Sequence, residues 1–290
     1  MSNASFAPNF PSPVAVPGQA PAARRGPRCG TVTAPSIQAL RLVRLVVVVV
    51  GLWLTARWLP TVPRTHSHVS VRRWALRVLG ALRVDVRASG HLPASDAPLL
   101  VVANHVSWLD SYAINTVSAA RFVAKFEVRQ WPVIGTIAAG FGTIFLKRGC
   151  PRAAARAVAC LDQVLRRGEP VAAFPEGTTT DGRGLLRFYP ALFQSAVLSA
   201  ARVQPVAIRY RGGDGSPTQA AAFVGDMSVL DSVRRLLREP RLTAELIFCA
   251  PLDAEGRTRR ELAMLARAAI VAALGSGGDA RQPTPLRRAA

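Results

Sequence analysis

Short apolar runs alternate with helical stretches from residue 98 onward, and this alternation restricts the chain to a few architectures. The runs PLLVVA (98–103) and PVAAFP (170–175) have the length and composition of buried strands, whereas residues 151–168 repeat apolar side chains at helical spacing. Further strands are expected at 121–125, 142–147, 204–210 and 242–249, and further helices at 107–119, 190–201 and 257–274. Strands that alternate with helices favour an α/β fold with a mixed, largely parallel sheet covered by helices.

The two ends of the chain differ in composition from this core. Residues 1–35 hold seven prolines but no periodic apolar pattern, so we expect a disordered Pro/Ala-rich leader or a start codon assigned too early. Residues 275–290 are rich in Gly, Pro and Arg and are expected to form a flexible tail. The remainder divides into a membrane anchor with a basic amphipathic segment, 36–80, and one α/β domain, 81–274.

Residues 41–60 (RLVRLVVVVVGLWLTARWLP) include the one candidate for a membrane span. The stretch 42–59 reaches spanning length, and it has arginines near both ends and two tryptophans that suit a membrane interface. A helix that lies in the interface, a buried core helix and a signal peptide are the alternatives, although no good cleavage site follows the stretch.

The formal net charge is +20, from 37 basic and 17 acidic residues, and all but two of the basic residues are Arg. Part of this excess can reflect a GC-rich coding bias. Residues 1–89 nevertheless hold twelve arginines and one acid, so more than half of the excess charge flanks the apolar stretch. Arg72, Arg73 and Arg77 beside Trp74 fit a basic amphipathic helix on an anionic lipid surface. Because no helix-turn-helix, zinc or RNA-binding signature is present, we expect membrane lipid, not nucleic acid, as the partner.

The four cysteines, Cys29, Cys150, Cys160 and Cys249, form no CxxC pair, and no histidine lies near two of them at zinc spacing. We therefore expect reduced thiols, no disulfide framework and no metal site.

The motif NHVSWLD (104–110) directly follows the strand expected at 98–103, where open α/β sheets place active sites. If a helix begins near Ser107, Asp110 can turn back toward the imidazole of His105. A carboxylate on one ring nitrogen fixes the tautomer and leaves the other nitrogen as a general base. Since the chain lacks a G-x-S-x-G elbow, the proton would come from a substrate hydroxyl. A structural histidine is the alternative.

The motif FPEGTTTDG (174–182) follows a second buried strand. Glu176 is placed to orient a hydroxyl or a backbone group, and Gly177 and Gly182 permit tight turns whose N–H groups can face an anion or a polar headgroup. An ordinary polar loop is the alternative.

The motif GTIFLKRG (142–149) ends in Lys147 and Arg148, which can bind phosphate. The only two lysines of the chain, Lys125 and Lys147, both fall in this part of the core, which weakly favours a selected role over a solvated basic pair.

In this order, the motifs resemble those of the glycerolipid (1-acylglycerol-3-phosphate) acyltransferase family, bacterial lysophospholipid acyltransferase type. His105 and Asp110 match its NHxxxxD motif. Residues 142–148 match its G-x-[IV]-F-x-x-R block, residues 174–178 its FPEGT block, and 204–208 resemble its VPV-type block. The similarity covers roughly residues 70–250, and it implies an αβ-sandwich fold with a membrane-associated N-terminal part.

The resemblance implies an enzyme in which His105, oriented by Asp110, deprotonates the free hydroxyl of lysophosphatidic acid. The oxygen then attacks the thioester of acyl-CoA or acyl-carrier protein, without an acyl-enzyme intermediate and without a cofactor. The acceptor site is expected to include Asn104, Lys147, Arg148, Glu176, Gly177, Thr178 and Thr179. The implied location is the inner (cytoplasmic) membrane, with the catalytic domain facing the cytoplasm.

The chain departs from the family pattern at Thr179, where the family commonly has an arginine. This change removes one phosphate-binding charge, although Arg183 and Arg187 follow and could substitute. The variant also resembles relatives that acylate lyso-ornithine lipid, which lacks that phosphate. The same residues are also compatible with a hydrolase that uses the His–Asp pair or with a non-catalytic membrane-binding protein.

Overall fold

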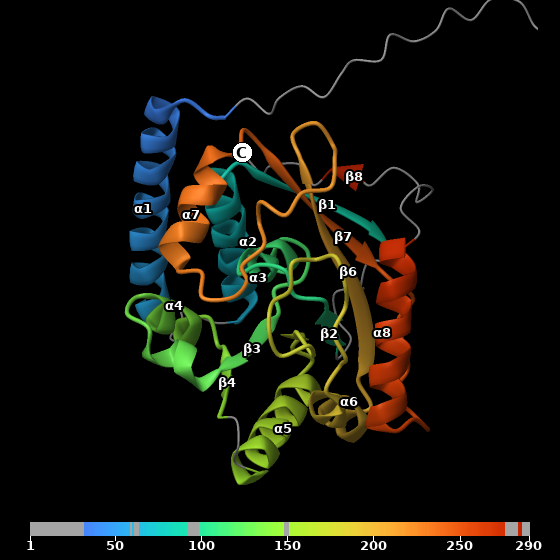
Figure 1. Ribbon diagram of the computed structural model, residues 1–290. Coiled ribbons are helices and arrows are strands. Elements are labelled where there is room, and N and C mark those ends of the chain that lie inside the picture. The colour runs from blue at the N-terminus through green and yellow to red at the C-terminus, as the bar shows by residue number, and fades with distance from the viewer. Residues whose placement is uncertain are drawn as a thin grey trace, which may run out of the picture. The chain divides into compact units, whose positions relative to one another are not determined.

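One eight-stranded sheet organises the computed structural model, which describes residues 32–58, 60, 64–91, 99–147, 151–275 and 284–285 (Figure 1). The strand order is β4-β3-β5-β2-β6-β7-β1-β8. The strands are β1 Val84–Gly90, β2 Leu99–Ala103, β3 Arg121–Lys125, β4 Ile144–Leu146, β5 Val171–Ala173, β6 Arg202–Gly212, β7 Leu242–Phe248 and β8 Thr284–Pro285.

Most neighbouring strands of this sheet run parallel. Strands β4, β3, β5, β2 and β6 pair in parallel, β7 runs antiparallel to β6 and parallel to β1, and β8 runs antiparallel to β1. The predicted mixed, largely parallel sheet is thus confirmed. Because parallel strands end at the same edge, the loops that follow β2 and β5 meet there.

Helices cover both faces of the sheet. On one face, α2, α3, α7 and the inner side of α1 form one hydrophobic cluster, and on the other face α5, α6 and α8 form a second. The helices are α1 Pro35–Trp58, α2 Arg64–Ala81, α3 Leu109–Asn115, α4 Ile134–Gly140, α5 Pro151–Arg166, α6 Phe193–Ser199, α7 Val229–Arg238 and α8 Arg259–Gly275, with short 3-10 helices η2 Phe126–Gln130 and η3 Pro190–Leu192. Strand β2 is buried along its whole length, as its run of Leu, Val and Ala predicts.

Some elements differ from the prediction. The helix expected at 107–119 is shorter in the structure and ends at Asn115. The Asn115 side chain accepts the backbone N–H of Ala120 (3.1 Å), and this bond turns the chain out of the helix. Strand β1 and helices α4 and α7 were not predicted. Of these, α7 has a clear local cause: Ser228 caps it by accepting the N–H of Asp231 (3.1 Å).

Little of the predicted leader and tail falls within the described residues. Residues 1–31 lie outside them, and α1 begins at Pro35. In the tail, Thr284–Pro285 pair with β1, whereas 276–283 and 286–290 lie outside. The predicted domain boundaries therefore stay predictions.

The N-terminal half of α1 is tied to α7 by a buried arginine. Arg41, only 4% exposed, donates to the carbonyl oxygens of Leu237 (3.2 Å), Glu239 (2.7 Å) and Pro240 (2.8 Å) at the C-terminal end of α7. A cation there satisfies carbonyl groups that the helix leaves unpaired and complements its dipole. The Arg41 side chain thus fixes α1 to α7.

The C-terminal end of α1 crosses α4 at very short range. A Cβ atom added at Gly140 would lie 2.1 Å from the carbonyl oxygen of Ala56, so any larger residue would force the two helices apart. With both ends held, α1 lies lengthwise on the domain and buries Leu45, Leu52 and Ala56.

The opposite side of α1 is exposed and apolar. We call this side the outer face of α1; it comprises Ile37, Leu40, Leu42, Val43, Val46, Val47, Val50, Leu54 and Trp58. By length and hydropathy, α1 could cross a membrane, and only 22% of its most apolar window is buried.

Candidate active site

The predicted catalytic motif lies at the carboxyl end of β2, beside β6. Asn104 is buried, and its amide group donates to the carbonyl of Ile208 (2.9 Å) and accepts from the N–H of the same residue (2.7 Å). Asn104, predicted as a substrate-binding residue, thus uses both polar groups of its side chain to join β2 to β6 just ahead of His105.

His105 and Asp110 are brought together as the spacing predicts. The Nδ1 atom of His105 lies 2.9 Å from Oδ2 of Asp110. The carboxyl group is fully buried, whereas the histidine side chain is 20% exposed. Since an ionised carboxylate only accepts hydrogen bonds, the pairing assigns the proton to Nδ1 and leaves Nε2 with its lone pair.

Four donors converge on the Asp110 carboxylate. Besides His105, the backbone N–H groups of Val106 (2.7 Å) and Ser107 (2.9 Å) donate to Oδ2, and the Tyr210 hydroxyl donates to Oδ1 (2.7 Å). Burial, reinforced by the Asp110 charge, raises the pKa of Tyr210 well above its usual value, so this hydroxyl keeps its proton and remains a donor. The buried carboxylate is therefore stabilised by hydrogen bonds and held in one orientation.

The imidazole ring is also held from its flat side. It stacks on Phe174, with 3.8 Å between ring centroids and 5° between planes, and Phe122 of β3 packs against Phe174 in turn (5.8 Å). The stack and the Asp110 bond together restrict the ring to one rotamer.

Glu176 binds the backbone on two sides of the site. Its Oε1 accepts the N–H of His105 (2.7 Å) and its Oε2 accepts the N–H of Leu186 (2.8 Å). Burial raises the pKa of Glu176, and the two N–H groups partly offset that rise. Glu176 is thus a positioning residue in this structure, which ties the loop after β5 to the histidine.

We expect Glu176→Gln to lower kcat/KM roughly tenfold and the free energy of unfolding by about 1–3 kcal/mol, because an amide NH₂ would face a backbone N–H. Steady-state kinetics and thermal unfolding would measure the two effects. Glu255→Gln, at an exposed position, is the matched control and should change neither quantity. Wild-type values for Glu176→Gln would contradict the assigned role.

The remaining FPEGT-loop residues lie over the motif. Gly177 has a φ of 72°, Thr178 is exposed, and the Thr179 hydroxyl donates to the carbonyl of Phe223. The Thr180 N–H donates to the carbonyl of His105 (2.8 Å). Three loops that are distant in sequence are therefore joined around the histidine.

The predicted phosphate-binding pair lies farther along the sheet. Lys147 is exposed just after β4, and Arg148 lies outside the described residues. In the strand order, β3 and β5 separate β4 from β2, a distance of roughly 14 Å at the usual strand spacing. Lys147 thus belongs to the same edge as His105 but does not contact the His–Asp pair.

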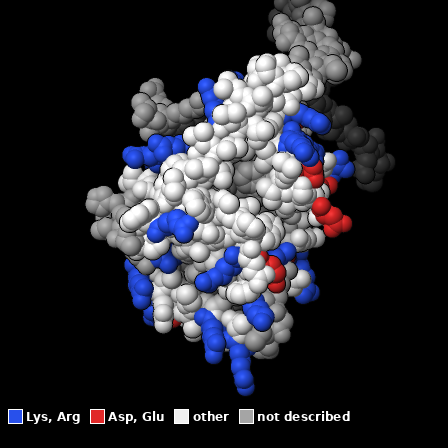
Figure 2. Space-filling view, turned by 90° about the vertical axis from the view of Figure 1, so that its left-hand side faces the viewer, with Lys and Arg blue, Asp and Glu red and all other residues white. Residues whose placement is uncertain are grey.

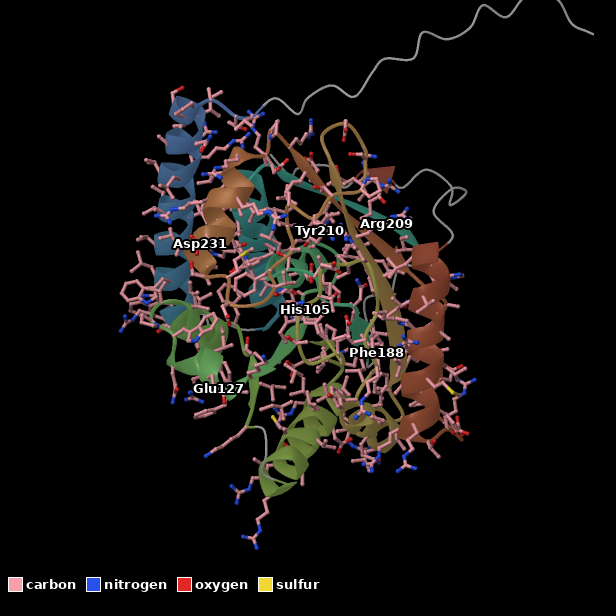
Figure 3. The ribbon with its side chains drawn as sticks, viewed as in Figure 1. His105, Glu127, Phe188, Arg209, Tyr210 and Asp231 are labelled. Carbon is pink, nitrogen blue, oxygen red and sulfur yellow. The ribbon has the colours of Figure 1, made fainter. Side chains whose placement is uncertain are left out.

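Sequence reasoning missed Tyr210 as part of the site. Its strand was predicted, but the pairing of β2 with β6 that brings it to Asp110 was not. No role was predicted for Trp108 either. Its indole N–H donates to the hydroxyl of Ser232 in α7 (3.0 Å). Figure 3 shows His105 and Tyr210 near each other at the centre of the molecule.

An oriented, partly exposed histidine backed by a buried carboxylate is equipped to take a proton from a bound hydroxyl. Among the described residues, no group of three or more His, Cys, Asp or Glu side chains is arranged to hold a metal ion. The fold and this pair define the class of protein: an α/β fold with a carboxylate-backed histidine at the carboxyl edge of its sheet.

Comparison with known proteins identifies the family of the chain. The family model described as Acyltransferase matches residues 83–209. A lyso-ornithine lipid O-acyltransferase of Pseudomonas aeruginosa is 40% identical over 258 residues, which cover 88% of this chain and 97% of that protein. A 1-acyl-sn-glycerol-3-phosphate acyltransferase of Neisseria meningitidis is 36% identical over 177 residues, 61% of this chain and 69% of that protein.

The fold has a counterpart among solved structures. The crystal structure of the 1-acyl-sn-glycerophosphate (LPA) acyltransferase PlsC from Thermotoga maritima matches with a TM-score of 0.56 and 21% identity, over 81% of this chain and 96% of that one. The chain therefore belongs to the 1-acylglycerol-3-phosphate acyltransferase family and is an acyltransferase of lysolipid type. The resemblance identified from the motifs is confirmed.

Proposed function

We propose that this enzyme moves a fatty acyl group from the thioester of acyl-CoA or acyl-carrier protein to the free hydroxyl of a lysolipid. The observation that carries the proposal is the 2.9 Å contact between His105 and the buried Asp110. Nε2 of His105 accepts the hydroxyl proton while the hydroxyl oxygen attacks the thioester carbonyl. The tetrahedral intermediate then expels the thiolate, which takes the proton from the imidazolium, so that an ester and a free thiol leave. No cofactor is required besides the donor.

We propose lyso-ornithine lipid as the acceptor. The most extensive similarity described above is to an enzyme named for that lipid. Thr179 stands where the family commonly has arginine, and its side chain is uncharged. Its hydroxyl already donates a hydrogen bond to the backbone carbonyl of Phe223. These observations favour an acceptor without phosphate over lysophosphatidic acid, the main acceptor expected from the motifs.

The two arginines that could replace the missing charge have other partners. Arg183 bonds Gln219 (3.3 Å) and lies 3.8 Å from the carboxylate of Asp181. The guanidinium of Arg187 lies 4.9 Å from the ring centroid of Tyr189. Lysophosphatidic acid stays the second candidate, because Lys147 is exposed at the same sheet edge and relatives named for that substrate match over most of the domain.

An acceptor competition would test this proposal. With labelled acyl-CoA or acyl-carrier protein, we expect kcat/KM for lyso-ornithine lipid to exceed that for lysophosphatidic acid at least about tenfold. Thr179→Arg should shift the ratio toward lysophosphatidic acid by roughly tenfold, because it restores a cation that binds phosphate. Thr179→Gln loses the same hydroxyl without adding charge and should leave the ratio unchanged. A wild-type preference for lysophosphatidic acid would overturn the proposed acceptor but not the reaction.

We further propose that the enzyme acts at the cytoplasmic side of the inner membrane, with α1 lying in the lipid interface. Both ends of α1 are bonded to or packed against the domain, and its outer face is apolar from Ile37 to Trp58, with the exposed Arg44 and Arg57 beside it. Figure 2 views the molecule from the side on which α1 lies. The surface that faces the viewer is largely uncharged along its middle, with Lys and Arg around this area and few acidic residues. This distribution supports contact with anionic lipid.

A further inference from the structure

The turn that joins η2 to α4 exposes three successive apolar residues. We call residues 131–133 the Trp131 tip. Trp131 is 43% exposed and Val133 42%, and Pro132 between them is exposed as well. None of these residues takes part in the proposed chemistry, so their exposure requires another explanation.

The Trp131 tip is held outward by its own backbone. Val133 has a φ of 63°, a conformation that is unfavourable for a β-branched residue. The N–H of Ile134 donates to Pro132 (2.6 Å) and that of Gly135 donates to Trp131 (2.9 Å), which closes the turn. A Cβ atom at Gly135 would lie 2.2 Å from the carbonyl oxygen of Arg129, so a glycine is needed there. The apolar side chains are thus presented in a fixed turn.

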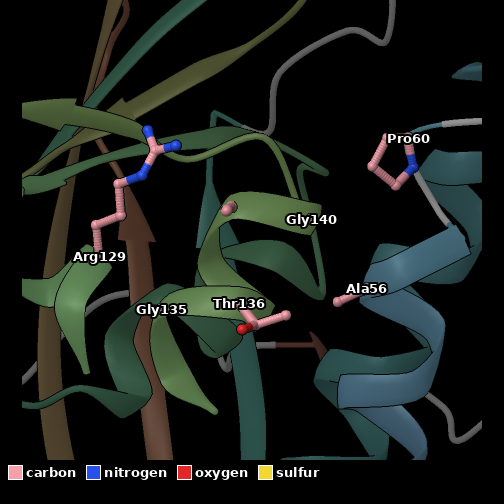
Figure 4. A pocket seen from close by; sticks show the side chains of 7 residues that line it. Ala56, Pro60, Arg129, Gly135, Thr136 and Gly140 are labelled. Carbon is pink, nitrogen blue, oxygen red and sulfur yellow. The ribbon is translucent and has the colours of Figure 1, made fainter. Parts of the chain in front are cut away.

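The helix that the Trp131 tip begins, α4, packs against the C-terminal end of α1. Helix α4, which the tip begins, crosses α1 where Gly140 meets Ala56. Between the two elements lies an open hollow of about 400 Å³, lined by Ala56, Pro60, Arg129, Gly135, Thr136, Ala139 and Gly140 (Figure 4). Trp58, 71% exposed, ends the outer face of α1 at this same place. The outer face and the tip therefore lie on adjoining elements.

The chemistry of this region suits the boundary of a lipid bilayer. Tryptophan side chains favour the headgroup level, and exposed arginines lie close in sequence to the two exposed tryptophans, Arg57 next to Trp58 and Arg129 two residues before Trp131. Arg57 lies over the ring of Trp53 (4.7 Å), and Arg129 is exposed on the rim of the hollow. Apolar surface of this extent is uncommon on the free surface of a soluble monomer.

The position of the Trp131 tip relates it to the catalytic histidine. The tip follows η2 and β3, whose Phe122 packs against Phe174 beneath the imidazole. Strands β3 and β2 belong to the parallel part of the sheet, so the tip extends from the same edge as His105. We propose that the Trp131 tip is a second membrane contact, which enters the headgroup region beside α1 and holds the catalytic edge of the sheet against the bilayer. This inference rests on the proposed membrane location.

Flotation with vesicles of phosphatidylethanolamine and phosphatidylglycerol would test the proposal. We expect Trp131→Asp to lower the vesicle partition coefficient roughly tenfold and to lower acylation of vesicle-borne lysolipid to a similar extent. Its activity toward the same acceptor in detergent micelles should stay at the wild-type level, which also shows that the variant folds. Trp131→Phe, which keeps an aromatic side chain, should retain most of the wild-type vesicle binding.

Two further variants separate the possible outcomes. Met264→Asp, at a 66% exposed position of α8 on the other face of the sheet, should bind vesicles like the wild type. Val47→Asp, on the outer face of α1, should weaken binding. If Val47→Asp weakens binding and Trp131→Asp does not, the tip is not a membrane contact, although the location of α1 stands. If neither weakens binding, the proposed membrane location itself is wrong.

Discussion

His105→Ala should reduce acyl transfer by about 10³-fold or more. The substitution removes the group whose Nε2 is proposed to take the proton of the acceptor hydroxyl, and the chain has no second histidine after residue 91 that could replace it. The Asp110 carboxylate would remain buried with three of its four donors. Transfer of labelled acyl chains to lyso-ornithine lipid would measure the loss.

The control for this variant is His91→Ala. His91 is exposed at the end of β1, and the bond that it makes to Phe248 uses its backbone N–H (2.8 Å), which alanine keeps. We expect its kinetics to be unchanged. Vesicle binding and the unfolding temperature should show that His105→Ala remains folded, because alanine keeps the backbone bonds of residue 105 to Glu176 and Thr180. Turnover above a tenth of the wild-type rate would disprove the role of His105, and thioester cleavage without an acceptor would favour a hydrolase instead.

The pairing of His105 with Asp110 could be predicted because its causes are local. The two residues are five apart, they follow an apolar run that can only be a buried strand, and the Asp110 carboxylate also accepts the N–H groups of Val106 and Ser107. Those backbone bonds turn the carboxylate toward the ring. The parallel sheet was predictable for a similar reason, since each strand and helix carries its own periodicity.

The contacts that complete the site depend on strand order, which the sequence does not state. Tyr210 meets Asp110 from 100 residues away, and Glu176 meets the backbone of His105 from 71 residues away. Both contacts exist because β2 pairs with β5 on one side and with β6 on the other. A polar loop after a strand predicts that its side chains lie at the sheet edge, but not which backbone group each one binds.

The apolar N-terminal stretch shows a further limit of composition. Its length and hydropathy fit a spanning helix, an interfacial helix or a core helix alike. Composition also does not predict that Arg41 ties this helix to the end of α7, almost 200 residues away. Arg44 and Arg57, the two arginines for which a headgroup contact was predicted, are exposed, whereas Arg41 binds carbonyl groups of the domain.

Asp110→Asn tests how much of the catalysis depends on the charge of the carboxylate. All four donors to Asp110 require an acceptor, and an amide replaces one acceptor atom with a donor. If the NH₂ group takes the place of Oδ2, it faces two backbone N–H groups and forces His105 to protonate at Nε2, which is then no longer a base. If it takes the place of Oδ1, the Tyr210 hydroxyl can rotate to accept it, but the negative charge that stabilises the imidazolium is lost.

In either orientation we expect Asp110→Asn to lower kcat/KM by about 10³-fold, mainly through kcat, because the interaction strengthens only when the imidazolium forms. Tyr210→Phe is the matched variant: it removes the hydrogen bond to Oδ1 but keeps the charge and the three donors at Oδ2, so it should cost about tenfold or less. Single-turnover rates with donor and lysolipid in micelles would compare the two variants without a contribution from membrane binding. Equal losses in both would mean that Asp110 acts through the shape of its hydrogen-bond network, and a loss below tenfold in Asp110→Asn would remove the carboxylate from the mechanism.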